Sequence, residues 1–276
     1  MNFDVIPLGP FLISVGGVIL LIGFFLSSFF LIFTTRQKNL PITFLSENLF
    51  IFLLIPLLIG RIGSFIQMFN SFKLRIVDAG FLEKIIIFIK YFFAIWEGSI
   101  DPVWVILGFL IIFSLFSIWK KQSILRWLDA FVLPSIIAVI FVHIGGFFSA
   151  WGYGKPVNKD FFMAISYDLQ NVRFSGPIHP VQIYGAVLYF VILLIGMKLW
   201  HKSNQKSKKW KDGTFFYLIT FFCALLNGLL EFFRGNAVKI IFDFIRLPQA
   251  LSFSLAVLSL IFFVLNTHKE KKNIHF

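Results

Sequence analysis

Residues 11–33 read FLISVGGVILLIGFFLSSFFLIF, a long and predominantly apolar stretch without a charged side chain. An α-helix rises about 1.5 Å per residue, so roughly twenty apolar residues are needed to cross a hydrocarbon core of about 30 Å. The stretch is too long for the apolar region of a signal peptide, and no basic segment precedes it. It is therefore predicted to cross a membrane as a helix.

Six further stretches of this kind follow along the chain. They lie at residues 48–65, 102–118, 128–148, 181–199, 214–233 and 247–265. The chain is 58% hydrophobic and 14% charged, a balance that a water-soluble globule cannot bury in one core. These features predict an all-α integral membrane protein with about seven transmembrane helices. Because no repeat or linker divides the chain, residues 1–276 are expected to form a single transmembrane domain.

Lysine and arginine are distributed unevenly between the two sets of connections. The more basic set comprises Arg36, Lys38, Lys120, Lys121, Arg126, Lys198, Lys202, Lys206, Lys208, Lys209, Lys211, Lys269, Lys271 and Lys272. By the positive-inside rule this side is cytoplasmic, which puts the N-terminus outside and a short basic tail, residues 266–276, inside. Anionic lipids then account for the net charge of +12, and no nucleic-acid partner is expected.

The connections on the outer side are long. Residues 66–101 and 149–180 form two of them, and the first contains the apolar run 85–95. That run is too short to span easily, so it is predicted to be a short helix lying at the outer interface. Long, structured connections on one side are where a functional site is expected. The lone Cys223 lies within a predicted span, so a disulfide framework and a metal site built from several cysteines are both excluded.

Ionisable residues inside the predicted spans are candidates for function, because burying a charge in lipid is costly. Arg61 lies near the outer end of the second span between Gly60 and Gly63. It could meet a lipid headgroup, or its side chain could snorkel to the interface. Glu231 and Arg234 are three residues apart and are expected on one face of the sixth helix. They could neutralise each other, or Glu231 could orient Arg234 toward an anion.

Two histidines lie at positions that could serve catalysis. His143 falls within the fourth span, where it is either a buried core imidazole or a catalytic group. His179 lies where the second outer connection enters the fifth span, and Gln182 follows one turn later. With Tyr184 they make three polar groups at a helix start, which could hold a headgroup or cap the helix.

Five short motifs together resemble the bacterial prolipoprotein diacylglyceryl transferases. They are GRIG at 60–63, WEG at 96–98, HIGGFF at 143–148 running on to GKP at 154–156, HPVQIY at 179–184 and EFFR at 231–234. They occur in the order of that family and near its spacing, across nearly the whole chain.

The resemblance implies an enzyme of the bacterial cytoplasmic (inner) membrane. Such an enzyme moves a diacylglyceryl group from phosphatidylglycerol to the lipobox cysteine of preprolipoproteins. Its partners are then phosphatidylglycerol, the signal peptides of preprolipoproteins and membrane lipids, and neither a cofactor nor a metal ion is expected. A cysteine thiolate is the nucleophile, so a base or a local positive field must lower the pKa of the thiol, and a cationic group must stabilise the departing phosphate.

The sequence departs from the motifs of that family at several positions. Val103 replaces a histidine, His143 an arginine, Gly146 an asparagine, Trp151 and Gly185 glutamates, and Gly16 a tyrosine. The positions that match are Arg61, Gly145, Gly154, His179, Gln182, Tyr184, Glu231 and Arg234.

From the matching positions the resemblance implies a set of roles. Arg61 and Arg234 hold the phosphate, and Glu231 positions Arg234. To assist deprotonation this chain offers His143 or His179, and neither stands at the position of the family's histidine, which Val103 occupies. The headgroup pocket is lined by Gln182, Tyr184, Gly145 and Gly154.

All these residues are expected to converge at the outer side of the membrane. Arg61, His143, His179, Tyr184 and Arg234 should line one cavity open to lipid. Two other functions remain open. One is a catalytically inactive relative that binds phospholipid or lipoprotein signal peptides. The other is a small-solute transporter, for which no paired discontinuous helices are found.

Overall fold

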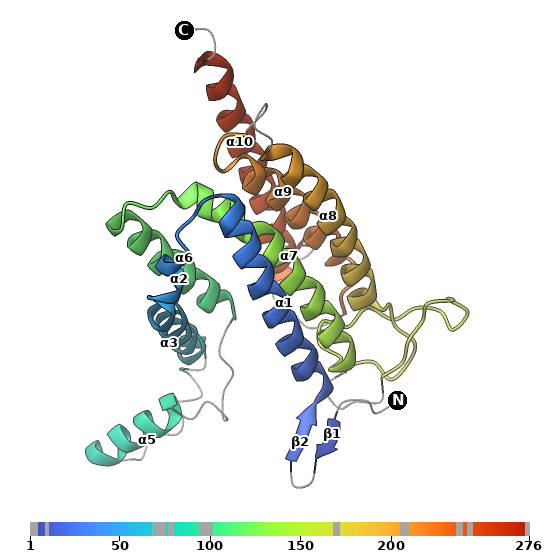
Figure 1. Cartoon of the computed structure of the whole chain (residues 1–276). Helices are drawn as coiled ribbons and strands as arrows, with labels where there is room; N and C mark the ends of the chain where they lie inside the picture. Colours follow the sequence, from blue (N-terminus) through green and yellow to red (C-terminus); the bar gives the residue numbers. More distant parts are fainter. Residues whose placement is uncertain are drawn as a thin grey trace. The chain divides into compact units, whose positions relative to one another are not determined.

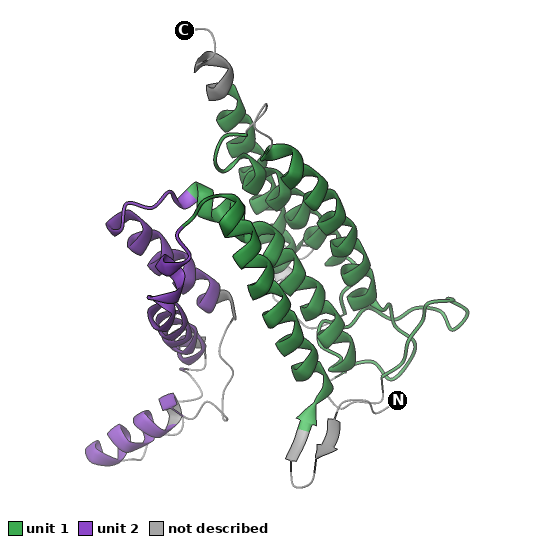
Figure 2. Cartoon of the chain, viewed as in Figure 1, with its two compact units in different colours: residues 1–40, 125–276 green, residues 41–124 purple. Residues whose placement is uncertain are grey.

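The computed structural model describes residues 5–8, 11–67, 69, 76, 80–93, 102–167, 172–204, 210–235, 240–241 and 245–273. The chain divides into two compact units, which Figure 2 shows in different colours. Unit 1 comprises Met1–Leu40 and Leu125–Phe276, and unit 2 comprises Pro41–Ile124. The expectation of one transmembrane domain over the whole chain stays a prediction.

Unit 1 is a bundle of long helices. They are α1 (Val15–Gln37), α7 (Ile124–Phe148), α8 (Val181–Ser203), α9 (Thr214–Leu230) and α10 (Leu247–Asn273). Figure 1 shows these helices alternating in direction, so that α7 and α9 begin at the end of the bundle where α1 and α8 end. Its apolar core includes Leu133, Ile136, Val181, Phe215 and Ile219.

Helices α1 and α7 run antiparallel in close contact. A side chain added at Gly23 would overlap Phe141, and one at Gly16 would meet Ser149. Further along, the hydroxyl of Ser27 donates to the carbonyl of Pro134 at 2.8 Å. Small residues and a hydroxyl donor therefore let two membrane helices approach closely, as is usual where both helices are apolar.

The first predicted span begins four residues too early. Phe11–Ser14 forms strand β2, which pairs antiparallel with strand β1 (Val5–Leu8), and α1 starts only at Val15. The hydroxyl of Ser14 accepts a hydrogen bond from the backbone N–H of Gly17 at 3.3 Å. Serine is a preferred N-cap, and this bond marks the helix start that hydropathy alone missed.

The sixth predicted span is also corrected. Helix α9 ends at Leu230, and residues 231–233 form a turn, so the prediction of helix up to Phe233 was wrong. Two short strands, β3 (Ile240–Ile241) and β4 (Ile245–Arg246), pair just before α10. Helix α10 then continues to Asn273, through most of the segment expected to form a basic tail.

Unit 2 contains α2 (Thr43–Ser46), α3 (Leu49–Gln67), α5 (Phe81–Phe93) and α6 (Pro102–Trp119). Helices α3 and α6 pack together, and aromatic rings fill the contact between them and α2. Helix α5 confirms that the apolar run predicted at residues 85–95 is helical over its described part. Its position at the membrane interface remains a prediction.

The helices present apolar side chains outward, as a membrane protein requires. Phe29 on α1 is 72% exposed, and dozens of other large apolar side chains are also exposed, most of them to a smaller extent. Within the part of the chain that the structure describes, five helices are long and apolar enough to cross a membrane, at Val15–Gln37, Leu49–Ile66, Ile124–Phe148, Val181–Ser203 and Leu247–His268. Two shorter apolar helices, Trp104–Trp119 and Thr214–Leu230, accompany them. The predicted class, a helical multi-pass membrane protein, is confirmed, whereas the count of seven spans and their orientation stay predictions.

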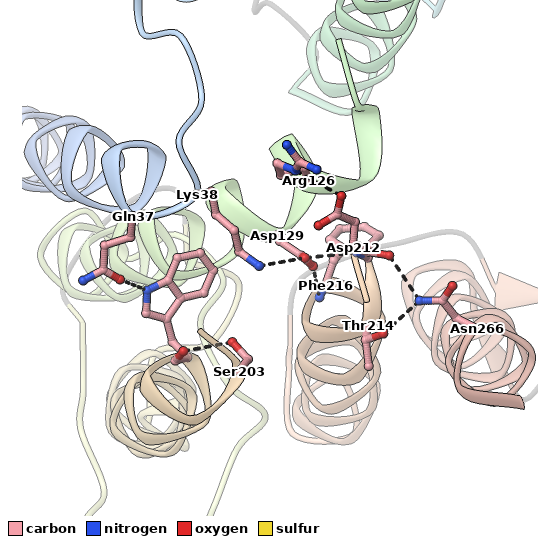
Figure 3. Close-up of polar contacts among 11 residues, drawn as sticks. Gln37, Lys38, Arg126, Asp129, Ser203, Asp212, Thr214, Phe216 and Asn266 are labelled. Atoms are coloured by element: carbon pink, nitrogen blue, oxygen red, sulfur yellow. Dashed lines mark hydrogen bonds and ion pairs between the residues drawn. The ribbon is translucent and has the colours of Figure 1, made fainter. Parts of the chain in front are cut away.

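A buried ion pair lies at the end of unit 1 where α7 and α9 begin. The Nζ of Lys38 lies 3.3 Å from Oδ2 of Asp129, and the two side chains are 2% and 1% exposed (Figure 3). The same carboxylate accepts the backbone N–H groups of Gly213 at 3.0 Å and Phe216 at 2.8 Å. Asp129 of α7 therefore caps the N-terminus of α9, where a negative charge is also favoured by the helix dipole.

Other polar contacts surround this pair. Trp200 of α8 donates its indole N–H to the side-chain oxygen of Gln37, and Lys38 lies 5.0 Å from the centre of the Trp200 ring. The amide of Asn266 donates to Thr214 at 2.9 Å (Figure 3). Five helices are thus tied together at one end of the bundle, opposite the matched motif residues of unit 1.

We expect this end to be cytoplasmic. Reporter fusions at Lys206 and after Lys272 should read cytoplasmic, and a fusion near Lys159 should read external, because the first two lie in the basic connections. Lys206 lies outside the described residues. Paired alkaline phosphatase and green fluorescent protein fusions give the measurement, and a reversed pattern at all three positions would contradict the predicted orientation.

Candidate functional site

The matched motif residues of unit 1 gather at the bundle end where α7 and α9 finish and α8 begins. The connection 149–180 crosses the turn that follows α9 there. The backbone N–H of Lys155 donates to the carbonyl of Phe233 at 2.7 Å, and that of Gly235 donates to Tyr153 at 2.8 Å. Gly154 and Arg234 lie between these two hydrogen bonds and are paired as an isolated antiparallel β-bridge. Residues about eighty positions apart in sequence are therefore held side by side by backbone hydrogen bonds.

Gly154 is required by this crossing. A Cβ at this position would overlap the carbonyl and the side chain of His179. The backbone N–H of His179 also donates to the carbonyl of Lys155 at 3.0 Å. Gly154 thus places the HPVQIY segment against the EFFR segment, because only glycine permits so close a backbone approach.

Glu231 and Arg234 form an ion pair in this turn. Nη1 of Arg234 donates to Oε1 of Glu231 at 2.5 Å. Glu231 is 1% exposed, whereas the side chain of Arg234 is 17% exposed. The expectation that both lie on one helical face was wrong, because α9 ends at Leu230. The pair forms across the turn instead, with the carboxylate inside and part of the guanidinium reaching the surface.

A third charged residue joins this pair. Nε of Arg246 lies 3.5 Å from Oε2 of Glu231, and its Nη1 donates to the carbonyl of Glu231 at 2.9 Å. The same Nη1 also donates to the carbonyl of Arg234. Arg246 belongs to none of the motifs that pointed to the other site residues. An arginine directly before an apolar span was the available signal, and it reads by default as an interfacial anchor.

His179 lies beside Tyr184 and Phe233. Its Nδ1 is 3.2 Å from the hydroxyl of Tyr184, and its ring packs edge-on against that of Phe233 with centroids 5.3 Å apart. Burial lowers the pKa of the His179 imidazole. Because the ordinary value is about 6.5, His179 is neutral at pH 7 and can accept a proton.

Gln182 is buried in the first turn of α8. Its Nε2 donates to the carbonyl of Trp151 at 3.1 Å, and its Oε1 has no hydrogen-bond partner among the described residues. Neither Gln182 nor His179 caps α8, whose N-cap residue is Pro180, without a side-chain hydrogen bond. Capping, one of the two roles left open for these residues, is therefore not observed.

His143 is buried within α7 and faces α8. Its ring stacks on Tyr189 with centroids 5.5 Å apart, and a Cβ added at Gly185 would overlap the imidazole. The guanidinium of Arg234 is near enough to interact electrostatically with both His143 and Tyr189. His143 and Gly185 are two of the positions that depart from the resembled motifs. His143 replaces an arginine of the motifs and Gly185 replaces a glutamate. Because the two positions contact each other, both substitutions alter the same place in the structure.

Gly145 and Gly146 lie where α7 approaches its neighbours. A Cβ at Gly145 would lie 3.0 Å from the carbonyl of Gly16, and one at Gly146 would lie 3.1 Å from that of Trp151. The nearest neighbour of Gly145 is therefore α1, and a role in lining a headgroup pocket remains a prediction. Gly146 and Trp151, which also depart from the motifs, are again neighbours.

Arg61 belongs to unit 2. It is buried on α3, where its Nε donates to the carbonyl of Phe92 at 2.8 Å. Because Arg61 and Arg234 lie in different units, their expected meeting in one cavity stays a prediction. Val103 lies on α6 of the same unit, and the WEG motif at 96–98 lies outside the described residues.

A shallow, open hollow lies beside His179. It is lined by Val157, Asn158, Asp160 and Phe161, and the Phe161 ring packs on His179. None of the predicted site residues lines it, so it is not the expected lipid cavity. Among the residues that the structure describes, no group of three or more His, Cys, Asp or Glu side chains could hold a metal ion.

Comparison with known proteins identifies a family. The sequence model of the family described as prolipoprotein diacylglyceryl transferase matches residues 4–265. Relatives named phosphatidylglycerol–prolipoprotein diacylglyceryl transferase come from several bacteria. One from Protochlamydia amoebophila is 27% identical over 219 residues, which cover 76% of this chain and 54% of the relative. One from Blochmanniella floridana is 27% identical over 191 residues, 62% of this chain and 65% of the relative. One from Symbiobacterium thermophilum is 27% identical over 210 residues, 70% of this chain and 74% of the relative.

The match of the family model extends over far more than half of the chain, from the first strand to the last helix. The alignment with the Protochlamydia relative covers about half of that protein's length. By this match the chain belongs to the prolipoprotein diacylglyceryl transferase family.

Proposed function

We propose that this chain transfers a diacylglyceryl group from phosphatidylglycerol to the lipobox cysteine of preprolipoproteins in the bacterial cytoplasmic membrane. The observation that carries the proposal is the crossing of residues 153–155 with 233–235. It brings a neutral imidazole, His179, and a partly exposed guanidinium, Arg234, to one end of the bundle. A base and a phosphate-binding cation are the two groups that this chemistry requires.

The proposed reaction is a displacement at carbon. The cysteine sulfur attacks a glyceryl carbon of phosphatidylglycerol, a C–S bond forms, and the C–O bond to the phosphate breaks. Glycerol-1-phosphate leaves with the bonding electrons, and the thiol proton passes to a base. Arg234 stabilises the phosphate as negative charge grows on it, and a guanidinium suits this task because its planar fork can donate two hydrogen bonds.

His179 is the better of the two candidate bases. It is half-buried at the bundle end, and Tyr184 lies within hydrogen-bonding distance of its Nδ1. This contact orients the ring, and in the tautomer whose Nδ1–H donates to the Tyr184 hydroxyl oxygen, Nε2 is the nitrogen that accepts a proton. His143 is buried within α7 and stacked on Tyr189, where a signal-peptide cysteine would have to reach deeper into the bundle.

The pH dependence of transfer tests this role of His179. Because burial lowers its pKa, the base stays neutral at pH 7 and is protonated only as the pH falls through a value below about 6.5. Transfer should therefore decline on the acid side of that value. In His179→Asn the rate at pH 7 should be lower and the acid decline should be absent. An unchanged decline in His179→Asn would assign the ionisation to another group.

A second function has specific support. The departures at His143 and Gly185, and at Gly146 and Trp151, cluster near Gln182 and Arg234. They replace charged or amide side chains of the resembled motifs. A relative that binds phospholipid or signal peptides without transferring anything would tolerate such losses.

Complementation separates these two functions. Bacteria depleted of their own transferase should grow when this chain is expressed, and their lipoproteins should carry the diacylglyceryl group, as measured by mass spectrometry. A chain that inserts and accumulates normally, yet neither restores growth nor modifies a lipoprotein, would favour the non-catalytic function.

A further inference from the structure

Glu231 is the centre of a triad of charges. It is fully buried, one of its oxygens accepts from Arg234, and the other lies 3.5 Å from Nε of Arg246. The side chains of Arg234 and Arg246 are 17% and 12% exposed. A guanidinium stays protonated in proteins, so in this group of described residues two positive charges face one negative charge.

The charge balance decides what the triad can do. An isolated Glu231–Arg234 pair would be neutral overall, and a neutral pair attracts an anion only weakly. With Arg246 included, the triad carries one net positive charge, in a setting where charges act more strongly than in water. Burial lowers the pKa of the Arg246 guanidinium, Glu231 raises it and Arg234 lowers it further, so the three charges act on one another.

Arg246 is also tied to the main chain of the same turn. Its Nη1 donates to the carbonyls of Glu231 and Arg234, which are left without helical partners when α9 ends. It therefore holds both the backbone that carries Arg234 and the carboxylate that orients it.

We propose that Arg246 is a positioning residue that shares the carboxylate of Glu231 and so leaves the charge of Arg234 available to a phosphate anion. This inference rests on the proposed function for the identity of the ligand, a phosphodiester headgroup. A free phosphate ion has the same chemistry, and the experiment separates these two sources.

The test measures binding by the full chain in neutral detergent, by calorimetry. The probes are short-chain phosphatidylglycerol, short-chain phosphatidylcholine, which has no net charge, and inorganic phosphate. Arg246→Gln makes the triad neutral and should weaken phosphatidylglycerol binding about tenfold, with little effect on phosphatidylcholine. Arg173→Gln removes an exposed arginine from the connection 149–180 and is the matched control, expected to bind as the wild type does.

The double variant Arg246→Gln with Glu231→Gln is decisive. It restores one net positive charge, and the amide oxygen at position 231 can still accept from Arg234. Its affinity should return to within about threefold of the wild type, whereas a purely structural role for Arg246 would make it no better than the single variant. If Arg246→Gln fails to fold, as judged by thermal unfolding, Glu231→Gln alone should bind at least as tightly as the wild type.

The binding results distinguish the role of the triad from the identity of its ligand. Charge-dependent binding of phosphatidylglycerol supports both the triad and the proposed ligand. The same dependence on charge, seen with inorganic phosphate but not with phosphatidylglycerol, supports the triad and contradicts the lipid ligand. A double variant that binds no better than Arg246→Gln, or a weakened Glu231→Gln, overturns the triad.

Discussion

Replacing Arg234 with lysine should lower transfer, or phosphatidylglycerol affinity, by roughly one to two orders of magnitude. Lysine keeps the charge but lacks the planar fork, and a hydrogen bond to a charged group is worth about 1.5–3 kcal/mol, with about 1.4 kcal/mol corresponding to tenfold. Arg234→Ala should be worse, by more than about a hundredfold, because it also leaves Oε1 of the buried Glu231 without its donor.

The measurement is a transfer assay with purified wild type, Arg234→Lys and Arg234→Ala, supported by lipid binding and thermal unfolding. Equal activity in all three proteins would remove Arg234 from the site. A loss of folding without a specific loss of lipid affinity would make the pair with Glu231 purely structural.

Replacing Asp129 with alanine should destabilise the protein by about 3–5 kcal/mol. The change leaves the ammonium of Lys38 buried without its counter-ion, and breaking a buried ion pair costs about this much. It also removes the acceptor for the Gly213 and Phe216 backbone N–H groups, so α9 loses its cap. Unfolding in detergent, followed by circular dichroism, gives the measurement.

The nearby Arg126–Asp212 pair is the matched control (Figure 3). Its side chains are far more exposed, so Asp212→Asn should cost no more than about 1 kcal/mol. The double variant Lys38→Met with Asp129→Leu should be more stable than Asp129→Ala, because no buried charge is left unpaired. Similar losses in Asp129→Ala and Asp212→Asn would show that burial of the Lys38 pair contributes nothing special.

Most of the long apolar helices could be predicted from the sequence because the signal is local. A helix in lipid needs an apolar segment of a given length, and each such segment can be recognised from its own residues alone. The ends of the helices were predicted less well. The side chain of Ser14 caps α1 by a hydrogen bond, and the chain forms a turn after α9 ends at Leu230. A hydropathy average does not register either feature.

The candidate site was predicted only in part. Motif resemblance pointed to Arg234, His179 and Tyr184, and the structure brings these three together in unit 1. It did not point to Asp129, although an aspartate in a predicted span is costly, because its partner Lys38 precedes it by ninety-one residues. Arg246 was missed for a similar reason. Its hydrogen bond to the carbonyl of Glu231 joins residues that are separated in sequence by the segment containing β3.

The sequence by itself determined that this chain is a helical membrane protein, where most of its apolar helices lie, and which family motifs it carries, because each of these depends on consecutive residues. Only the tertiary structure decided that Gly185 makes room for His143, that Gly154 lets the connection 149–180 cross the turn at Arg234, and that Arg246 shares Glu231. These contacts join segments far apart in the chain. Their energies depend on distance and burial, which no local pattern of residues specifies.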